Sequence, residues 1–159
     1  MLANGPGGWV QTANFAITGV LIVAAAIGFA RKLGPKSRAL TWPLAGHGLA
    51  VFAAAFLPAD PVDGFPPGTP PGMPTSISAT GLAHFAAGGL AFLLLGLSGL
   101  IAAAVLRRRG ARGLAALSLL SGLVVLVGFF GGIALGVAGI WAAVVVGYAW
   151  LTVLSLRLR

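Results

Sequence analysis

The stretch TGLAHFAAGGLAFLLLGLSGLIAAAVLRRR, residues 80–109, decides the fold class of this chain. Its first part, 80–106, contains no Asp, Glu, Lys or Arg, and three arginines close it. A helix needs about 20 residues, at about 1.5 Å each, to cross a hydrocarbon core of about 30 Å. The stretch is therefore long enough for one membrane-spanning helix that ends at a basic boundary.

Similar apolar blocks recur on both sides of this stretch. Together they predict five membrane helices, over 13–30, 40–57, 80–106, 114–130 and 133–156. The last two form a helical hairpin that turns at Gly131-Gly132 or nearer Gly136. Only 8% of the residues are charged, whereas a soluble domain carries about a quarter. We therefore expect an all-α, polytopic transmembrane helical bundle that forms a single membrane domain over residues 1–159.

The distribution of charge predicts the orientation of these helices. Lys and Arg occur only within 31–38, 107–112 and 157–159, and both acids, Asp60 and Asp63, lie in the segment 58–79. Five crossings place all three basic segments on one side and both acids on the other. Because cytoplasmic loops of membrane proteins carry the excess of Lys and Arg, the N-terminus is predicted outside and the C-terminus inside.

Composition narrows the location, the partners and the chemistry. Richness in Ala and Gly, with Arg preferred over Lys, is typical of a GC-rich bacterial genome, so we expect a multi-pass protein of the bacterial inner (plasma) membrane. The net charge of +8 then favours anionic lipid at the cytoplasmic face, and no nucleic acid. The chain has no cysteine, which excludes disulfides and thiolate chemistry. No Lys, Asp or Glu lies inside a predicted helix, which excludes a retinal Schiff base and a carboxylate proton relay.

The connection PADPVDGFPPGTPPGMPTSISA, residues 58–79, differs from the rest of the chain and faces outside in the predicted topology. Its seven prolines restrict the backbone and prevent a helix. We expect an ordered loop that caps the bundle. Asp60-Pro61 and Asp63-Gly64 are typical turn dipeptides, in which the carboxylate bonds the downstream backbone. Ser78 is a candidate N-cap of the helix that follows, as are Ser76 and Thr80.

Two histidines, His47 and His84, lie within predicted membrane helices. An ionisable residue at such a position is a candidate functional residue, although an interhelical hydrogen bond is the simpler interpretation for each. The predicted helices place them at heights that differ by roughly 14 Å. Two ligands of one zinc ion lie within about 4 Å of each other, so we do not expect a shared metal.

His84 has possible partners at its own height. Asp60 and Asp63 directly follow the second helix, and Gln11 and Asn14 lie at the outer mouth of the first. Asp60, Asp63 and His84 together form a candidate metal or hydrolytic site at the outer face. A hydrogen-bonded Asp–His pair that holds the loop to the bundle is the alternative, and we predict no cofactor.

Three segments resemble a family of bacterial integral membrane proteins known as domain of unknown function 998. They are WVQTANFAITG at 9–19, ADPVDGFPPGTP at 59–70 and SISATGLAHFAAG at 76–88. The resemblance implies a helical bundle, usually with six crossings, and supplies no reaction. It also implies that this chain lacks the usual first helix. Its motif positions here are Asp60, Asp63, Gly64, Ser78, Gly81 and His84.

These observations favour a non-enzymatic accessory or interaction subunit, or a lipid-interacting protein. A bundle with an unpartnered face is expected to form a homo-oligomer or to join a larger membrane complex. The alternative is an outer-leaflet, metal-dependent hydrolase or lipid-modifying enzyme that uses Asp60, Asp63 and His84. A third possibility is a small-molecule or ion pathway that reaches His47.

Overall fold

The computed structural model describes residues 2–34, 38–72 and 74–158, with the side chains of 2, 133 and 134 left aside. Lys36, Met73 and Arg159, which belong to segments discussed above, lie outside the described residues. A short 3₁₀ helix, η1, precedes five α-helices. The elements are η1 (Leu2–Asn4), α1 (Gly8–Leu33), α2 (Arg38–Ala54), α3 (Ala79–Arg108), α4 (Arg112–Phe130) and α5 (Gly132–Arg157). The described residues form no strand, only an isolated bridge between Val62 and Phe65. The all-α prediction is therefore confirmed.

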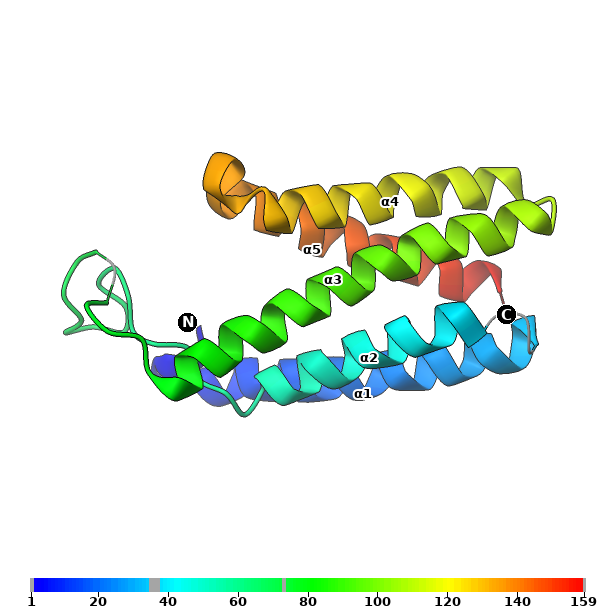
Figure 1. Ribbon diagram of the computed structural model, residues 1–159. Helices are drawn as coiled ribbons and strands as arrows, with labels where there is room; N and C mark the ends of the chain where they lie inside the picture. The colour runs from blue at the N-terminus through cyan, green and yellow to red at the C-terminus, as the bar shows by residue number, and fades with distance from the viewer. Residues whose placement is uncertain (1, 35–37, 73, 159) are drawn as a thin grey trace.

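Two helical hairpins are joined by one long diagonal helix. Figure 1 shows α1 and α2 side by side, α4 and α5 as a second pair, and α3 crossing from the first pair to the second. Each helix packs against the next along the chain, and α3 also contacts α5. The hairpins are therefore held together mainly through α3.

Four of the five helices are long and apolar enough to cross a membrane. They are Gly8–Leu33, Ala79–Arg108, Arg112–Phe130 and, within α5, Leu135–Arg157. The remaining helix, α2, has 17 residues and spans about 26 Å, slightly less than the hydrocarbon core of about 30 Å. The predicted multi-pass membrane bundle is thus found with four candidate spans.

Helix α2 ends at Ala54, three residues before the predicted end at Leu57. The amide groups of residues 55–57 bond to the carbonyl groups three residues earlier, as in a tightened last turn. Pro58 then follows, and the residue before a proline disfavours the helical conformation. The apolar block in the sequence is therefore longer than the helix, because its last residues, Phe56 and Leu57, lie in this turn.

The other ends also differ from the apolar blocks. Helix α1 begins at Gly8, not at residue 13, because the polar residues Gln11 and Thr12 are compatible with a helix although they are not apolar. The α4–α5 hairpin uses both predicted turning points. Gly131 closes α4, and Gly136, with φ +54°, interrupts the predicted helix over 133–156. Positive φ is most readily accessible to glycine.

Glycine-to-backbone contacts bring the helices together. A Cβ atom on Gly48 of α2 would lie 2.7 Å from the carbonyl oxygen of Gly19 in α1. A Cβ on Gly99 of α3 would lie 2.7 Å from the Cα of Gly122 in α4. Small residues at such crossings allow two backbones to pack directly, which is the main source of attraction between helices in lipid.

Three glycines spaced four residues apart, Gly128, Gly132 and Gly136, do not all pack in this way. Gly128 packs against Gly139 of α5, where an added Cβ would lie 2.5 Å from the carbonyl oxygen. Gly132 and Gly136 have no atom within 4 Å of an added Cβ. They lie at the turn, so their role is conformational and not close packing.

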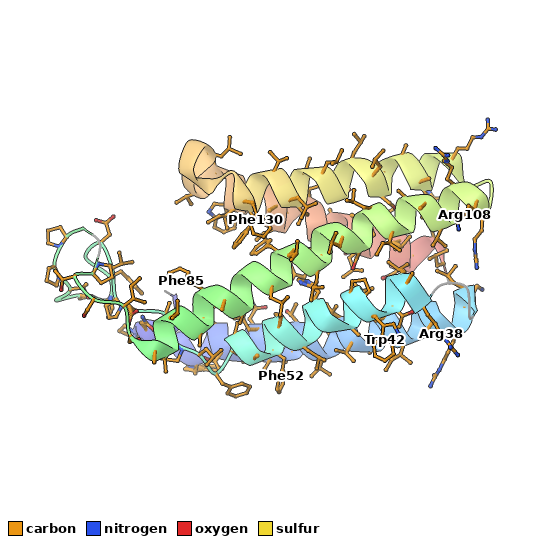
Figure 2. The ribbon with its side chains drawn as sticks, viewed as in Figure 1. Arg38, Trp42, Phe52, Phe85, Arg108 and Phe130 are labelled. Atoms are coloured by element: carbon orange, nitrogen blue, oxygen red, sulfur yellow. The ribbon has the colours of Figure 1, made fainter. Side chains whose placement is uncertain are left out.

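The described basic residues gather at one end of the bundle, which we call the arginine end. Arg31 and Lys32 lie in the last turn of α1, and Arg107 and Arg108 in that of α3. Figure 2 shows Arg38 and Arg108 together at this end, with Phe85 toward the other. The Arg109 guanidinium donates to the Leu33 carbonyl at 2.5 Å, which joins the end of α3 to the end of α1. We call the opposite end, which carries residues 58–79, the loop end.

Candidate functional site at the loop end

The first half of the loop folds on itself through Asp63. Its Oδ1 accepts from the Gly72 amide at 3.3 Å, and its own amide donates to the Gly72 carbonyl at 2.9 Å. Asp63 has φ 52° and Gly64 has φ 78°, so the chain reverses sharply here. Asp63 and Gly64 thus form the turn that their dipeptide predicts.

The start of the loop is tied to the start of α3 through Asp60 and Ser78. Asp60 Oδ2 accepts from the Ser78 amide at 3.0 Å. Ser78 is the N-cap, because its Oγ accepts from the Gly81 amide at 2.9 Å, and it also pairs with the Thr80 hydroxyl. A Cβ on Gly81 would collide with the Asp60 carboxylate. Glycine at position 81 therefore leaves room for the carboxylate beside the positive end of the helix dipole.

His84 joins α3 to the chain that follows α2. Its Nδ1 lies 2.6 Å from the Leu57 carbonyl oxygen. Because a carbonyl can only accept, Nδ1 carries the hydrogen and Nε2 of the neutral ring is an acceptor. Leu57 lies in the tightened last turn of α2, so its carbonyl has no helical partner further along the chain. His84 satisfies this group.

The N-terminal segment also reaches this site, a contact that the sequence analysis missed. The Asn4 side-chain amide donates to the Ala59 carbonyl at 2.5 Å. An added Cβ on Gly5 would lie 2.7 Å from the Phe65 ring, so the loop packs directly on this glycine. The run Asn4-Gly5-Pro6-Gly7 is rich in turn residues. This composition was the available signal for a folded segment.

A small cavity lies where these elements meet. It has a volume of about 110 Å³, and its polar lining residues are Gln11 and Thr12 of α1 and His84 of α3. Phe15, Ala54 and Ala55 supply apolar lining. The structure thus brings together Gln11 and His84, two of the predicted site residues. Asn14 does not line the cavity; its Oδ1 accepts from the Thr18 hydroxyl at 3.4 Å.

The structure does not gather Asp60, Asp63 and His84 into a metal site. Each binds a different backbone group, and no group of three or more His, Asp or Glu in the described parts of the chain could hold a metal ion. The arrangement links the loop to the bundle.

His47 lies far along α2 from this site and is 2% exposed. Its Nδ1 lies 2.9 Å from the Ala91 carbonyl oxygen of α3. Its Nε2 is buried and has no hydrogen-bond partner among the described residues. The ring faces Tyr148 of α5 at a centroid distance of 6.0 Å. His47 therefore makes the interhelical hydrogen bond that is the simpler interpretation of a histidine in a membrane helix. Its ring and the His84 ring bind different carbonyl groups, those of Ala91 and Leu57.

Comparisons with known proteins identify a family and name no reaction. Neither the curated proteins nor the solved structures include a match to this chain. One family model does match it, over residues 1–157, and its description is "Protein of unknown function (DUF998)". Because this match spans nearly the whole chain, the protein belongs to the DUF998 family.

Proposed function

We propose that this protein is a non-enzymatic interaction subunit of the bacterial inner membrane, working with further copies of itself or in a larger membrane complex. The observation that carries the proposal is the use of the polar motif residues at the loop end. Asp60, Asp63, Ser78 and His84 each bind a backbone group of the loop or of the helix ends. Residues used in this way hold the loop to the bundle as a cap.

The exposed surface supports association within the bilayer. Large apolar side chains are exposed on all five α-helices; they include Leu21 of α1, Leu49 of α2, Leu90 of α3, Val127 of α4 and Val137 of α5. The bundle also divides into two hairpins that share mainly α3. In a membrane, such faces meet either lipid tails or helices of a partner.

The arginine end supports the proposed orientation and an anionic lipid partner. Helix α2 runs beside α1 from the arginine end back to the loop end (Figure 1). With α2 counted as a fifth crossing, the basic ends of α1 and α3 lie on the same side of the membrane. With positive residues inside, the N-terminus lies outside and the C-terminus in the cytoplasm. Each basic residue near an anionic surface contributes about 1 kcal/mol to its attraction.

In-membrane photocrosslinking tests the interaction. A photoreactive residue replaces Val137 of α5, which is 69% exposed, or Leu21 of α1, which is 62% exposed, in the native membrane. We expect at least one position to give a discrete protein adduct that is dominated by one partner or by a second copy. Adducts with lipid alone at both positions would contradict the proposal.

Elemental analysis tests the non-enzymatic part separately. We expect the purified wild type and the variants Asp60→Ala and His84→Asn to contain the same background level of metal. Stoichiometric metal in the wild type that both substitutions remove would favour the outer-leaflet hydrolase instead. Asp63→Ala, which removes the third candidate ligand, is measured beside them and should contain the same background level of metal.

A further inference from the structure

The cavity at the loop end goes beyond the proposed function, because association in the bilayer requires no ligand. Residues from η1, α1, the end of α2, the loop and α3 all line it. Its volume of about 110 Å³ compares with the roughly 150 Å³ of an engineered cavity that accepts benzene. It therefore has space for several water molecules or for one molecule with a few heavy atoms.

The polar groups of the lining are not used up by the protein. Nδ1 of His84 is bonded to the Leu57 carbonyl, which leaves Nε2 as an acceptor. The described chain offers no hydrogen-bond partner to this Nε2 or to the Gln11 carboxamide, which can both donate and accept. The Thr12 hydroxyl makes one long bond, of 3.4 Å, to the Gly8 carbonyl and can still accept. Three groups with remaining hydrogen-bonding capacity thus surround one small volume.

The lining also selects against charge. Among the residues that the structure describes, no Asp, Glu, Lys or Arg lines the cavity. The nearest carboxylate along the chain, Asp60, is bonded to the Ser78 amide. The described basic residues lie at the opposite, arginine end. An anion would find no countercharge here, and desolvating any ion without a partner is costly.

We propose that this cavity binds a small uncharged polyol, either free or as the hydroxyl-bearing headgroup of a neutral lipid. One ligand hydroxyl donates to His84 Nε2. A second exchanges hydrogen bonds with the Gln11 carboxamide, while Phe15 and the alanines of α2 contact the carbon atoms. The site lies at the end of the α1–α2 hairpin, where headgroups meet a membrane protein.

The test uses the two histidines of the chain as paired reporters. Protein labelled with ¹⁵N-histidine in detergent is titrated with glycerol while the ring nitrogens are followed by NMR. We expect a saturable change of the His84 Nε2 resonance and none of the His47 resonances, because His47 is buried elsewhere. A parallel sample in phosphatidylcholine nanodiscs, with or without diacylglycerol, tests the lipid source.

A matched pair of variants separates binding from solvent effects. Gln11→Leu removes a lining carboxamide at similar size, and we expect about tenfold weaker binding. Asn14→Leu, three residues along the same helix but outside the cavity, should bind as the wild type does. His84→Asn can keep the donor to Leu57 and lacks Nε2, so we expect it to fold and to lose glycerol binding. Saturation-transfer NMR on the glycerol protons measures this, since it needs no His84 signal.

Each outcome decides the proposal. A response to glycerol supports a free polyol, and a response to diacylglycerol alone supports a lipid headgroup. No saturable response to either would show that the cavity holds water only and would overturn the proposal. An equal response in Gln11→Leu would show that binding does not use the cavity carboxamide and would overturn it as well.

Discussion

His47 in the helix interior and His84 at the loop end make the same hydrogen bond in different surroundings. Each presents Nδ1 to a backbone carbonyl oxygen, at 2.9 Å for His47 and 2.6 Å for His84. His47 is enclosed by α2, α3 and Tyr148 of α5, and its Nε2 has no partner in the described structure. His84 is half-buried and lines a cavity that also contains Gln11 and Thr12. The bond from Nδ1 to a carbonyl explains how each ring is held at the end of or inside the bundle. The difference lies at Nε2, which is enclosed in His47, whereas the His84 ring lines a cavity.

The largest expected effect comes from truncating the His47 ring, with His84 as the comparison. His47→Ala leaves a void in a fully packed region, and we expect a loss of about 3 kcal/mol in the free energy of unfolding. His84→Ala mainly removes one hydrogen bond beside an existing cavity, with a loss of about 1 kcal/mol. Unfolding in mixed micelles of mild detergent and SDS measures both. Equal losses would contradict the distinction between the two regions.

The second test concerns the backbone contact beside His47. Gly48→Ala places a Cβ 2.7 Å from the Gly19 carbonyl oxygen and 2.9 Å from Val23 Cγ2. Because both are on the facing helix, α1 and α2 must move apart, and we expect a loss of about 2 kcal/mol in the same assay. Gly28→Ala is the control, since an added Cβ there has no neighbour within 4 Å. A stable Gly48→Ala variant would show that the α1–α2 crossing is looser than described.

At the loop end we expect a smaller and local effect. Asp60→Ala removes the acceptor of the Ser78 amide, which stabilises the start of α3 by about 1 kcal/mol. Hydrogen exchange should become faster for peptides that contain Ser78, with no change around His47. Asp63→Ala should instead expose the Gly72 amide. If Asp60→Ala also speeds exchange in the middle of α2, the two regions are coupled and the comparison fails.

The smallest expected effect sharpens the interior half of the comparison. The indole N–H of Trp150 in α5 donates to Ser118 Oγ in α4 at 2.9 Å, and Trp150 is 2% exposed. Trp150→Phe removes this bond, and interhelical hydrogen bonds in membrane proteins contribute about 0.6 kcal/mol on average. Trp141→Phe, at a residue that is 63% exposed, should leave the unfolding free energy unchanged. A loss of several kcal/mol in Trp150→Phe would contradict this value.

Much of the fold could be predicted because the bilayer imposes a simple rule on the sequence. A membrane helix needs a long apolar run, so the five helices could be located from the five blocks. Their ends were less predictable. The first turn of α1 is polar enough to fall outside the apolar block, and the end of α2 depends on Pro58 and on the turn at 55–57.

The candidate site could be predicted only as a set of residues. Asp60, Ser78 and His84 stand out because they are polar residues beside apolar helices, but their partners are backbone groups that leave no trace in the spacing. Any residue at the same place in the chain would offer the same backbone group, as Leu57 and Ala59 offer a carbonyl and Ser78 an amide. For this reason the sequence placed Asp60 and His84 in one hypothetical centre, and the structure gives each a separate role.

By itself, the sequence determined that this chain is a helical membrane protein and where its basic residues lie, because burial in lipid depends on long runs of residue type. Only the tertiary structure decided which glycines bring helices together, which histidine is enclosed, and that Gln11 and His84 line one cavity. Those features depend on the rotation and crossing of helices. Rotation of an apolar helix leaves its hydropathy unchanged, so packing between helices has to select it.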